Sequence, residues 1–319
     1  MKTDSRPKNF AAIGVGGYIA PRHLKAIHDT GNCLLAAVDV NDSVGILDRH
    51  SFDVEFFTEI ERFDRHLEKL RFGPEESKID YVSVMSPNYL HDAHCRLALR
   101  VDAHAICEKP LVINPWNLDY LASLEEETGK RIYTVLQLRY HAALLKIQEE
   151  LMSGANCQQH DVEITYVTPR GPWYDVSWKG NYEKSGGVVV NIGIHLFDML
   201  EWLFGPAGDL RIYRSTRGSC SGFTEFEKAR VKWFLSVDHN DLKLIPNAQG
   251  ASRSVRIDGE EVDFSVGFTD LHTRVYEEIL AGNGFGIEEA RPSIELTSRI
   301  RNAEIVPVDS MAHRFMKDG

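Results

Sequence analysis

Short apolar stretches alternate with longer segments of helical spacing over the first 135 residues of the chain. The apolar stretches are NFAAIGV, CLLAAVDV, IDYVSVMSP, AHAICEKP and RIYTVLQLR, and the helical segments lie at 20–31, 58–73, 89–101 and 115–129. Parallel strands need a crossover connection of roughly a dozen residues or more, which is usually a helix. The alternation therefore predicts an α/β fold that begins with a doubly wound parallel sheet, the Rossmann arrangement.

The pattern changes after about residue 135. Longer stretches of strand character with tight turns between them follow, namely HDVEITYVTPRG, LRIYRSTRG, ARVKWFLSVD and RSVRIDGEEVDFS. Helices are expected at 188–204 and 269–281. A chain of 319 residues exceeds the usual size of one domain. We therefore expect a Rossmann domain over 1–135 and an α+β domain with a large, mostly antiparallel sheet over 136–319.

The loop after the first apolar stretch is rich in glycine but departs from the usual dinucleotide fingerprint, G-x-G-x-x-G. Gly14 and Gly16 fit its first two positions, whereas Ile19 occupies the third. A three-residue step selects Gly14, Gly17 and Ala20 instead. These residues suit the tight turn, the close backbone approach to a pyrophosphate and the close packing of helix on strand. Gly16 then only adds room in the loop.

An acidic residue follows the second apolar stretch, where the fingerprint requires one. Asp39 lies 25 residues after Gly14. Its carboxylate is suited to accept hydrogen bonds from ribose hydroxyls and to repel a 2′-phosphate, which favours NAD over NADP. Tyr18 and Ile19 lie within the loop and are further candidate cofactor contacts. Strand, loop, helix, strand and acid occur in the required order, so we predict an NAD site.

Two further motifs carry polar residues suited to chemistry. The first places Glu108 and Lys109 at the end of a predicted parallel strand, where ligands bind in such sheets. Its alternative is a surface ion pair before a turn. The second, SGGVVVNIGIHLFDMLEWLFG, spaces Asn191, His195 and Asp198 as one polar stripe on an apolar helix. Because a lone histidine there is more often a core residue than a catalyst, the spacing alone leaves both interpretations open.

In this order, the glycine loop, Asp39, SPNYLH and EKP resemble the glucose–fructose oxidoreductase and inositol dehydrogenase family (Gfo/Idh/MocA). The resemblance implies that Glu108 contacts the nicotinamide ribose and that Lys109 lies beside nicotinamide and substrate. It also places His195 in the active site. The residues that match the family's cofactor-lining turn are Ser86, Pro87, Asn88 and His91.

Two positions qualify this resemblance. The family often has an aspartate where this chain has Asn191, and an amide cannot take up a proton. His195 therefore acts without that partner or yields the role of base to Lys109. We favour His195 as base, with Lys109 orienting and polarising the hydroxyl. His91 and His94 could suggest metal ligands, but no third ligand is evident, so we expect helix-surface histidines and no metal.

Ten segments in order, spread over nearly the whole chain, are similar to one branch of this family, the UDP-N-acetylglucosaminuronate 3-dehydrogenases of bacterial O-antigen synthesis. The resemblance implies NAD-dependent oxidation of the sugar's 3-hydroxyl to a ketone. It also implies a homotetramer and a role in making diacetamido uronic acid sugars for lipopolysaccharide. Reoxidation of NADH in place by 2-oxoglutarate stays open. A free polyol or monosaccharide is the alternative substrate.

A diphosphate and a uronate require cations and hydrogen-bond donors. The segment YVTPRGPWYDVSWKGNYEKSGG offers both just before the helix of His195, although the same residues could serve packing alone. The candidate substrate contacts are Lys109, Arg139, Arg170, Tyr174, Trp178, Lys179, Asn191 and His195.

Composition argues against several other functions. The net charge is −11 without a basic run, which argues against binding of nucleic acid. No apolar run is long enough to span a bilayer, and the first residues lack the apolar core of a signal peptide. Five scattered cysteines fit reduced thiols, so we expect a cytoplasmic protein. The presence of Lys109 and His195 disfavours a non-catalytic NAD-binding sensor.

Overall fold

The computed structural model describes residues 6–153, 159–246, 250–262 and 269–316. The chain divides into two compact units, the first made of 1–137 with 269–290 and the second of 138–268 with 291–319. The expected boundary after residue 135 lies two residues before the first crossing between the units. Residues 269–290 belong to the first unit, so a single boundary along the sequence does not describe the two units.

A six-stranded sheet forms the centre of the first unit, with the strand order β3-β2-β1-β4-β5-β6. All of its neighbouring strands pair in parallel, which confirms the predicted Rossmann arrangement. The strands are β1 (Asn9–Ile13), β2 (Cys33–Val38), β3 (Glu55–Phe57), β4 (Tyr81–Val84), β5 (His104–Cys107) and β6 (Ile132–Thr134). The order reverses between β1 and β4, and ligands bind beyond the carboxyl ends of strands at such a point.

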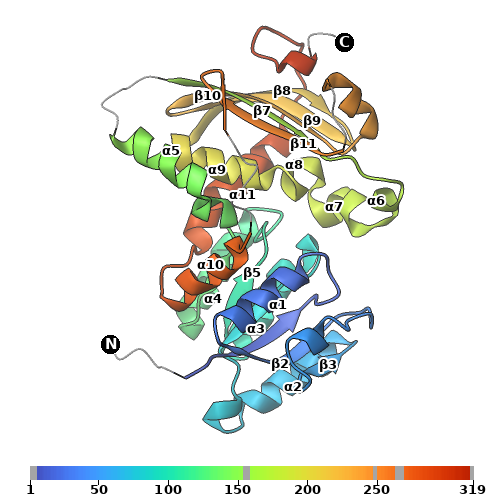
Figure 1. Cartoon of the computed structure of the whole chain (residues 1–319), viewed down its shortest axis with the longest axis vertical. Helices are drawn as coiled ribbons and strands as arrows, with labels where there is room; N and C mark the ends of the chain where they lie inside the picture. Colours follow the sequence, from blue (N-terminus) through green and yellow to red (C-terminus); the bar gives the residue numbers. More distant parts are fainter. Residues whose placement is uncertain (1–5, 154–158, 247–249, 263–268, 317–319) are drawn as a thin grey trace. The chain divides into compact units, whose positions relative to one another are not determined.

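The helices of the first unit follow the predicted crossovers, and one more helix comes from the later part of the chain. They are α1 (Ala20–Asp29), α2 (Ile60–Arg71), α3 (His91–Arg100), α4 (Trp116–Thr128) and α10 (Leu271–Leu280). Helix α10 packs on α1, and α3 packs on α4 (Figure 1). Leu24 and Ile27 on α1 are buried at helical spacing, and Pro21 stands in the first turn, where its missing N–H costs nothing.

A second six-stranded sheet has the order β12-β11-β7-β10-β9-β8. Strands β7 and β10 run parallel, and the other pairs are antiparallel, which confirms the predicted mixed, mostly antiparallel sheet. The strands are β7 (His160–Val167), β8 (Ala207–Ser215), β9 (Ser219–Phe226), β10 (Ala229–Ser236), β11 (Ser252–Ile257) and β12 (Glu260–Glu261).

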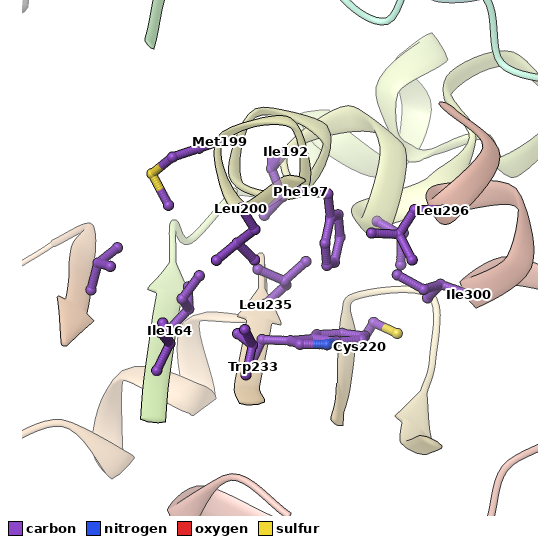
Figure 2. Close-up of a cluster of buried hydrophobic side chains, with 14 of the residues drawn as sticks. Ile164, Ile192, Phe197, Met199, Leu200, Cys220, Trp233, Leu235, Leu296 and Ile300 are labelled. Atoms are coloured by element: carbon purple, nitrogen blue, oxygen red, sulfur yellow. The ribbon is translucent and has the colours of Figure 1, made fainter. Parts of the chain in front are cut away.

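The helices of the second unit build its core against this sheet. They are α5 (Ala142–Ser153), α6 (Trp173–Val176), α7 (Tyr182–Ser185), α8 (Gly187–Asn191), α9 (Ile194–Phe204) and α11 (Ile287–Asn302), with the division between the units inside α11. Short 3-10 turns lie at Leu47–Arg49, Glu75–Ser77, Asn88–Leu90, Gln137–Tyr140, Trp178–Gly180, His239–Leu244 and Arg314–Met316. Figure 2 shows Phe197 and Leu200 of α9 pointing toward Trp233 and Leu235 of β10.

The structure corrects the single helix predicted over 188–204. Helix α8 ends at Asn191 and α9 begins at Ile194, with a bend of 46° between the paired helical segments. A Cβ on Gly193 would lie 2.7 Å from Leu235 Cδ1 and closer still to the carbonyl oxygen of Val189, so the break packs tightly. Asn191 and His195 therefore do not share one continuous helix face.

Among the described residues, no single helix is long and apolar enough to cross a membrane. One bent pair, 182–191 with 194–204, meets that test only by length and composition.

Glu201 on α9 gives a pH-dependent stability. Its Oε2 is buried without a hydrogen-bond partner, and burial raises its pKa to about 7. Because the folded pKa lies above the unfolded value of about 4.3, the folded state binds more protons between the two. Stability is therefore lost as pH rises through this window. We predict that the free energy of unfolding of Glu201→Gln, measured in urea, equals that of the parent protein at pH 4. At pH 8 it should exceed the parent value by about 1–3 kcal/mol. A difference that does not change with pH would contradict this.

Candidate functional site

The carboxyl ends of β1 and β4 touch at Gly14. Its φ is +92°, and a Cβ there would lie 2.7 Å from the carbonyl carbon and oxygen of Met85 and 2.8 Å from the nitrogen of Ser86. Backbone cannot move aside as a flexible side chain does, so only glycine fits. The loop that follows β1 thus lies directly against the loop that follows β4, at the reversal in strand order.

The rest of the glycine loop leads directly into α1. The N–H of Gly17 donates to the carbonyl of Gly14 at 3.1 Å, and a Cβ on Gly17 would lie 3.1 Å from the same oxygen. Ala20 is fully buried as the first residue of α1. Tyr18 is 84% exposed, whereas Ile19 is half-buried just before the helix. These positions suit the roles expected for Gly14, Gly17 and Ala20.

Asp39 follows β2 and is held by backbone donors. Its Oδ2 accepts from the N–H of Gly16 at 2.9 Å, and its Oδ1 accepts from the N–H of Asn41 at 2.8 Å. Gly16 is therefore an anchor for this carboxylate and more than added room in the loop. A carboxylate accepts about four hydrogen bonds, so capacity for ribose hydroxyls remains. The glycine cradle and this acid fit a dinucleotide.

Two histidines of α3 fasten the loop that follows β4. Nδ1 and Nε2 of His91 lie 2.7 and 2.8 Å from the carbonyl oxygens of Pro110 and Ser86, and Nδ1 of His94 lies 2.8 Å from Ser86 Oγ. We expected helix-surface histidines, but His91 and His94 are only 1% and 9% exposed. Burial lowers the pKa of His91, and it lowers the pKa of His94 to about 4. His91 thus joins the loops after β4 and β5. Asn88 is also buried here, and Pro87 half-buried.

Glu108 and Lys109 follow β5. Glu108 is 7% exposed, and its Oε1 accepts from Nε2 of His23 at 2.8 Å and lies 3.2 Å from Nε2 of His272. Burial alone would raise the pKa of Glu108, but the hydrogen bonds from both histidines outweigh it and hold that pKa well below its usual range. A surface ion pair therefore does not describe Glu108. Lys109 is half-buried.

No motif in the sequence singles out His23, His272 or Tyr276, which the fold brings to Glu108. The His23 ring also lies 2.8 Å from the hydroxyl of Tyr276, whose partner is Ser83 Oγ at 2.7 Å. The only signal in the sequence that could have indicated them is weak: each is a polar residue on the apolar face of an amphipathic helix. Within the described residues, the ligand atoms of His23, Glu108 and His272 lie within 4.8 Å of one another, so this cluster is the candidate for a metal.

In the second unit, Tyr174 and Lys179 lie in the segment before α8. Nδ2 of Asn191 donates to the Tyr174 hydroxyl at 3.3 Å. Nζ of Lys179 lies 5.7 Å from the ring centroids of Trp173 and of Trp178, a cation–π arrangement. Burial lowers the pKa of Lys179, and nearby Arg170 lowers it further. Arg170 is exposed, and Trp178 is half-buried.

Arg139 and Asp198 form a buried pair in the second unit. Nε and Nη2 of Arg139 donate to Oδ2 and Oδ1 of Asp198 at 3.2 and 2.7 Å. The side chains are 9% and 3% exposed. Two guanidinium nitrogens are thereby committed to the fold. His195 lies three residues before Asp198 on α9 and is half-buried.

The fold and these positions define a dinucleotide-binding Rossmann protein with a second α/β domain. Residues 8–136 match the family model described as "Oxidoreductase family, NAD-binding Rossmann fold", and 159–225 match "Oxidoreductase family, C-terminal alpha/beta domain". The chain belongs to the Gfo/Idh/MocA oxidoreductase family.

Solved structures of one relative are similar over nearly the whole chain. A WlbA (WbpB) dehydrogenase from Thermus thermophilus in complex with NAD and UDP-GlcNAcA is 45% identical, with 97% of this chain and 99% of that chain covered and a TM-score of 0.91. The same enzyme with NAD and alpha-ketoglutarate gives 46% identity, the same coverage and a TM-score of 0.91.

Curated relatives match over shorter stretches. Glucose-6-phosphate 3-dehydrogenase of Bacillus subtilis is 27% identical over 62% of this chain and 54% of its own length. The chain spans 39% and 38% of the lengths of two further curated relatives, an uncharacterised oxidoreductase of Synechocystis and the myo-inositol 2-dehydrogenase of Thermotoga maritima.

Asp39 should set the choice between the two nicotinamide dinucleotides. We expect Asp39→Ser to shift the ratio of the dissociation constants for NAD and NADP by about tenfold or more toward NADP, because one charge repulsion at the 2′-phosphate is lost. Isothermal titration calorimetry with both cofactors measures this ratio. Asp42→Ser removes a nearby exposed carboxylate and is the matched control. An unchanged ratio in Asp39→Ser would assign the discrimination to other residues.

Proposed function

We propose that this chain is an NAD-dependent dehydrogenase that oxidises the 3-hydroxyl of UDP-N-acetyl-D-glucosaminuronic acid to the 3-keto sugar. The observation that carries the proposal is the 45% identity, over nearly the whole length of both chains, to a dehydrogenase crystallised with NAD and UDP-GlcNAcA. The curated relative that oxidises position 3 of a sugar phosphate supports the position of attack.

The first unit supplies the proposed cofactor site. The glycine loop would hold the pyrophosphate, with Tyr18 and Ile19 beside it, and Asp39 would accept hydrogen bonds from the adenosine ribose. Ser86, Pro87 and Asn88 would line the nicotinamide half, and Glu108 would bind its ribose. His91 would act beneath this surface, because both of its ring nitrogens lie at backbone carbonyls. When bound, NAD supplies the acceptor for the hydride.

His195 and Lys109 are the proposed catalytic residues. Oxidation of an alcohol removes a hydride from the carbon and a proton from the hydroxyl, and a base must take that proton. Histidine suits this task near neutral pH without any adjustment. We propose His195 as base and Lys109 as the group that orients and polarises the hydroxyl. The reverse assignment is the alternative that the variants below distinguish.

The segment before α8 is the proposed contact for the nucleotide and uronate. Arg170 and Lys179 offer positive charge for the diphosphate, and Trp178 offers an aromatic surface. Tyr174 is fixed by Asn191 and is 5% exposed, so its hydroxyl edge would be its contact. Arg139 is a further proposed substrate contact, and its bonds to Asp198 through two nitrogens fix the position of its guanidinium group.

We further propose the setting in which this reaction runs. The sugar product would enter biosynthesis of diacetamido uronic acids for O-antigen lipopolysaccharide, in the cytoplasm, with the enzyme acting as a homotetramer. The relative bound to alpha-ketoglutarate supports 2-oxoglutarate as the oxidant that regenerates NAD in place. Light scattering on a sizing column tests the tetramer.

A turnover assay tests the proposed reaction. Purified protein receives NAD with UDP-N-acetylglucosaminuronic acid, UDP-N-acetylglucosamine or free polyols, each with and without 2-oxoglutarate. Mass spectrometry of the sugar detects loss of two hydrogen atoms even where NADH stays bound. We expect oxidation of the uronate alone. Turnover of a free polyol with no oxidation of the uronate would replace the nucleotide sugar by a polyol as substrate.

Variants of the two catalytic residues separate their roles. We expect His195→Asn and Lys109→Met each to lower kcat by about 10²–10⁴-fold. Loss of the acidic limb of the pH profile in His195→Asn, with the limb kept in Lys109→Met, would assign the base to His195. The opposite pattern would assign it to Lys109. His239→Asn, which changes an exposed histidine of the second unit, is the control and should retain full activity.

A further inference from the structure

Three buried polar side chains of the first unit form one continuous path to a fourth, Glu108. It runs from Ser83 on β4 to Tyr276 on α10, from Tyr276 to His23 on α1, and from His23 to the Glu108 carboxylate, over 2.7, 2.8 and 2.8 Å. His272 on α10 reaches the same carboxylate oxygen from another direction at 3.2 Å. Every member is less than one-tenth exposed.

The protons on this path have one self-consistent placement. An ionised Glu108 only accepts, so both histidines present Nε2–H to it. Burial lowers the pKa of His23, so its ring is neutral and its Nδ1 must accept a hydrogen bond. Burial raises the pKa of Tyr276 above its usual range, so its hydroxyl keeps the proton that Nδ1 needs. Ser83 then donates to the Tyr276 oxygen.

The second oxygen of Glu108 points to a ligand. Oε2 makes no hydrogen bond within the described residues, and it is not fully enclosed by protein atoms. It therefore retains access to solvent although Glu108 is 7% exposed. One oxygen is fixed by two imidazoles, and the other is presented at the carboxyl end of β5, where a cofactor lies in this fold.

We propose that His23 and His272 are positioning residues that aim the Glu108 carboxylate at the nicotinamide-side ribose of NAD. The inference rests on the proposed function only in that NAD is the cofactor, and it does not depend on the sugar. Tyr276 acts one step further back, by fixing the tautomer of His23. Helix α10 thereby contributes to cofactor binding although it comes some 160 residues after Glu108 in the chain.

A divalent cation is the competing occupant of the same three side chains. Two ligand atoms bound to one zinc at about 2.0–2.2 Å in a tetrahedron lie about 3.4 Å apart. Nε2 of His23 and Oε1 of Glu108 are 2.8 Å apart, which is the length of a hydrogen bond. The geometry therefore favours hydrogen bonds over a metal.

Binding measurements on His272→Leu and His23→Leu test the proposal. We expect the dissociation constant for NAD to rise about tenfold or more at pH 7, whereas that for ADP, which occupies only the adenosine half, changes less than twofold. His272→Gln keeps an N–H near Nε2 and should recover most of the NAD affinity. His313→Leu removes another buried histidine, in the second unit, and should leave both ligands unaffected.

The pH dependence gives a readout that packing alone would not move. With the donor of His272 removed and only His23 left, burial raises the pKa of Glu108 relative to that in the parent protein, and a protonated carboxyl accepts fewer hydrogen bonds. NAD affinity of His272→Leu should therefore fall as pH is lowered from 8 to 6, while the parent protein changes little. The titratable groups that face Glu108 are His23, His272, Tyr276, His91 and Cys107.

Three outcomes would overturn the proposal. Equal losses of NAD and ADP affinity would indicate general damage to the domain, and parallel pH profiles would remove the link to the carboxylate. Stoichiometric binding of Zn²⁺ that is lost in His272→Leu would make the cluster a metal site. Failure of the parent protein to bind NAD would instead refute the proposed function, and failure to oxidise the sugar would leave this test intact.

Discussion

The backbone contact at Gly14 is the constraint on which the cofactor edge of the first unit depends. A side chain at this position would overlap the peptide between Met85 and Ser86, so the loops after β1 and β4 can meet only around a glycine. The ring nitrogens of His91 then lie 2.8 and 2.7 Å from the carbonyl oxygens of Ser86 and Pro110, so the ring packs between the loops after β4 and β5 and donates to one of the two carbonyls. Three loops from three neighbouring strands are thereby fixed with respect to one another.

This arrangement places the buried carboxylate of Glu108 and the half-buried carboxylate of Asp39 at one edge of the sheet, and both have hydrogen-bond donors among the described residues. A buried carboxylate without donors would cost several kcal/mol or would take up a proton. Glu108 avoids both through His23 and His272, and Asp39 is fixed by two backbone N–H groups. The site is therefore organised before any ligand binds, which is what precise placement of a reacting centre requires.

The alternation of strands and helices, the glycine loop and Asp39 could be predicted because each is encoded in local sequence. Strand β3 has three residues, and β9, SCSGFTEF, is rich in small polar residues, so neither carries a strong strand pattern. The pairing of His23 with His272 could not be predicted, because the two residues lie 249 positions apart and meet only when α10 packs on α1. The helix break at Gly193 could not be predicted either. The helical periodicity of the sequence continues through it, and the close approach of Leu235 is a tertiary contact.

Asn191 illustrates how a local break changes the meaning of a motif. On one continuous helix its side chain would stand one turn from His195, as a partner for the base. In the structure it ends α8, and its amide donates to the hydroxyl of Tyr174. An amide donates this bond at every pH, whereas a carboxylate here would accept from the Tyr174 hydroxyl and would carry a charge. The asparagine therefore fits a role in fixing Tyr174, and under the proposed function His195 or Lys109 would take the proton of the hydroxyl.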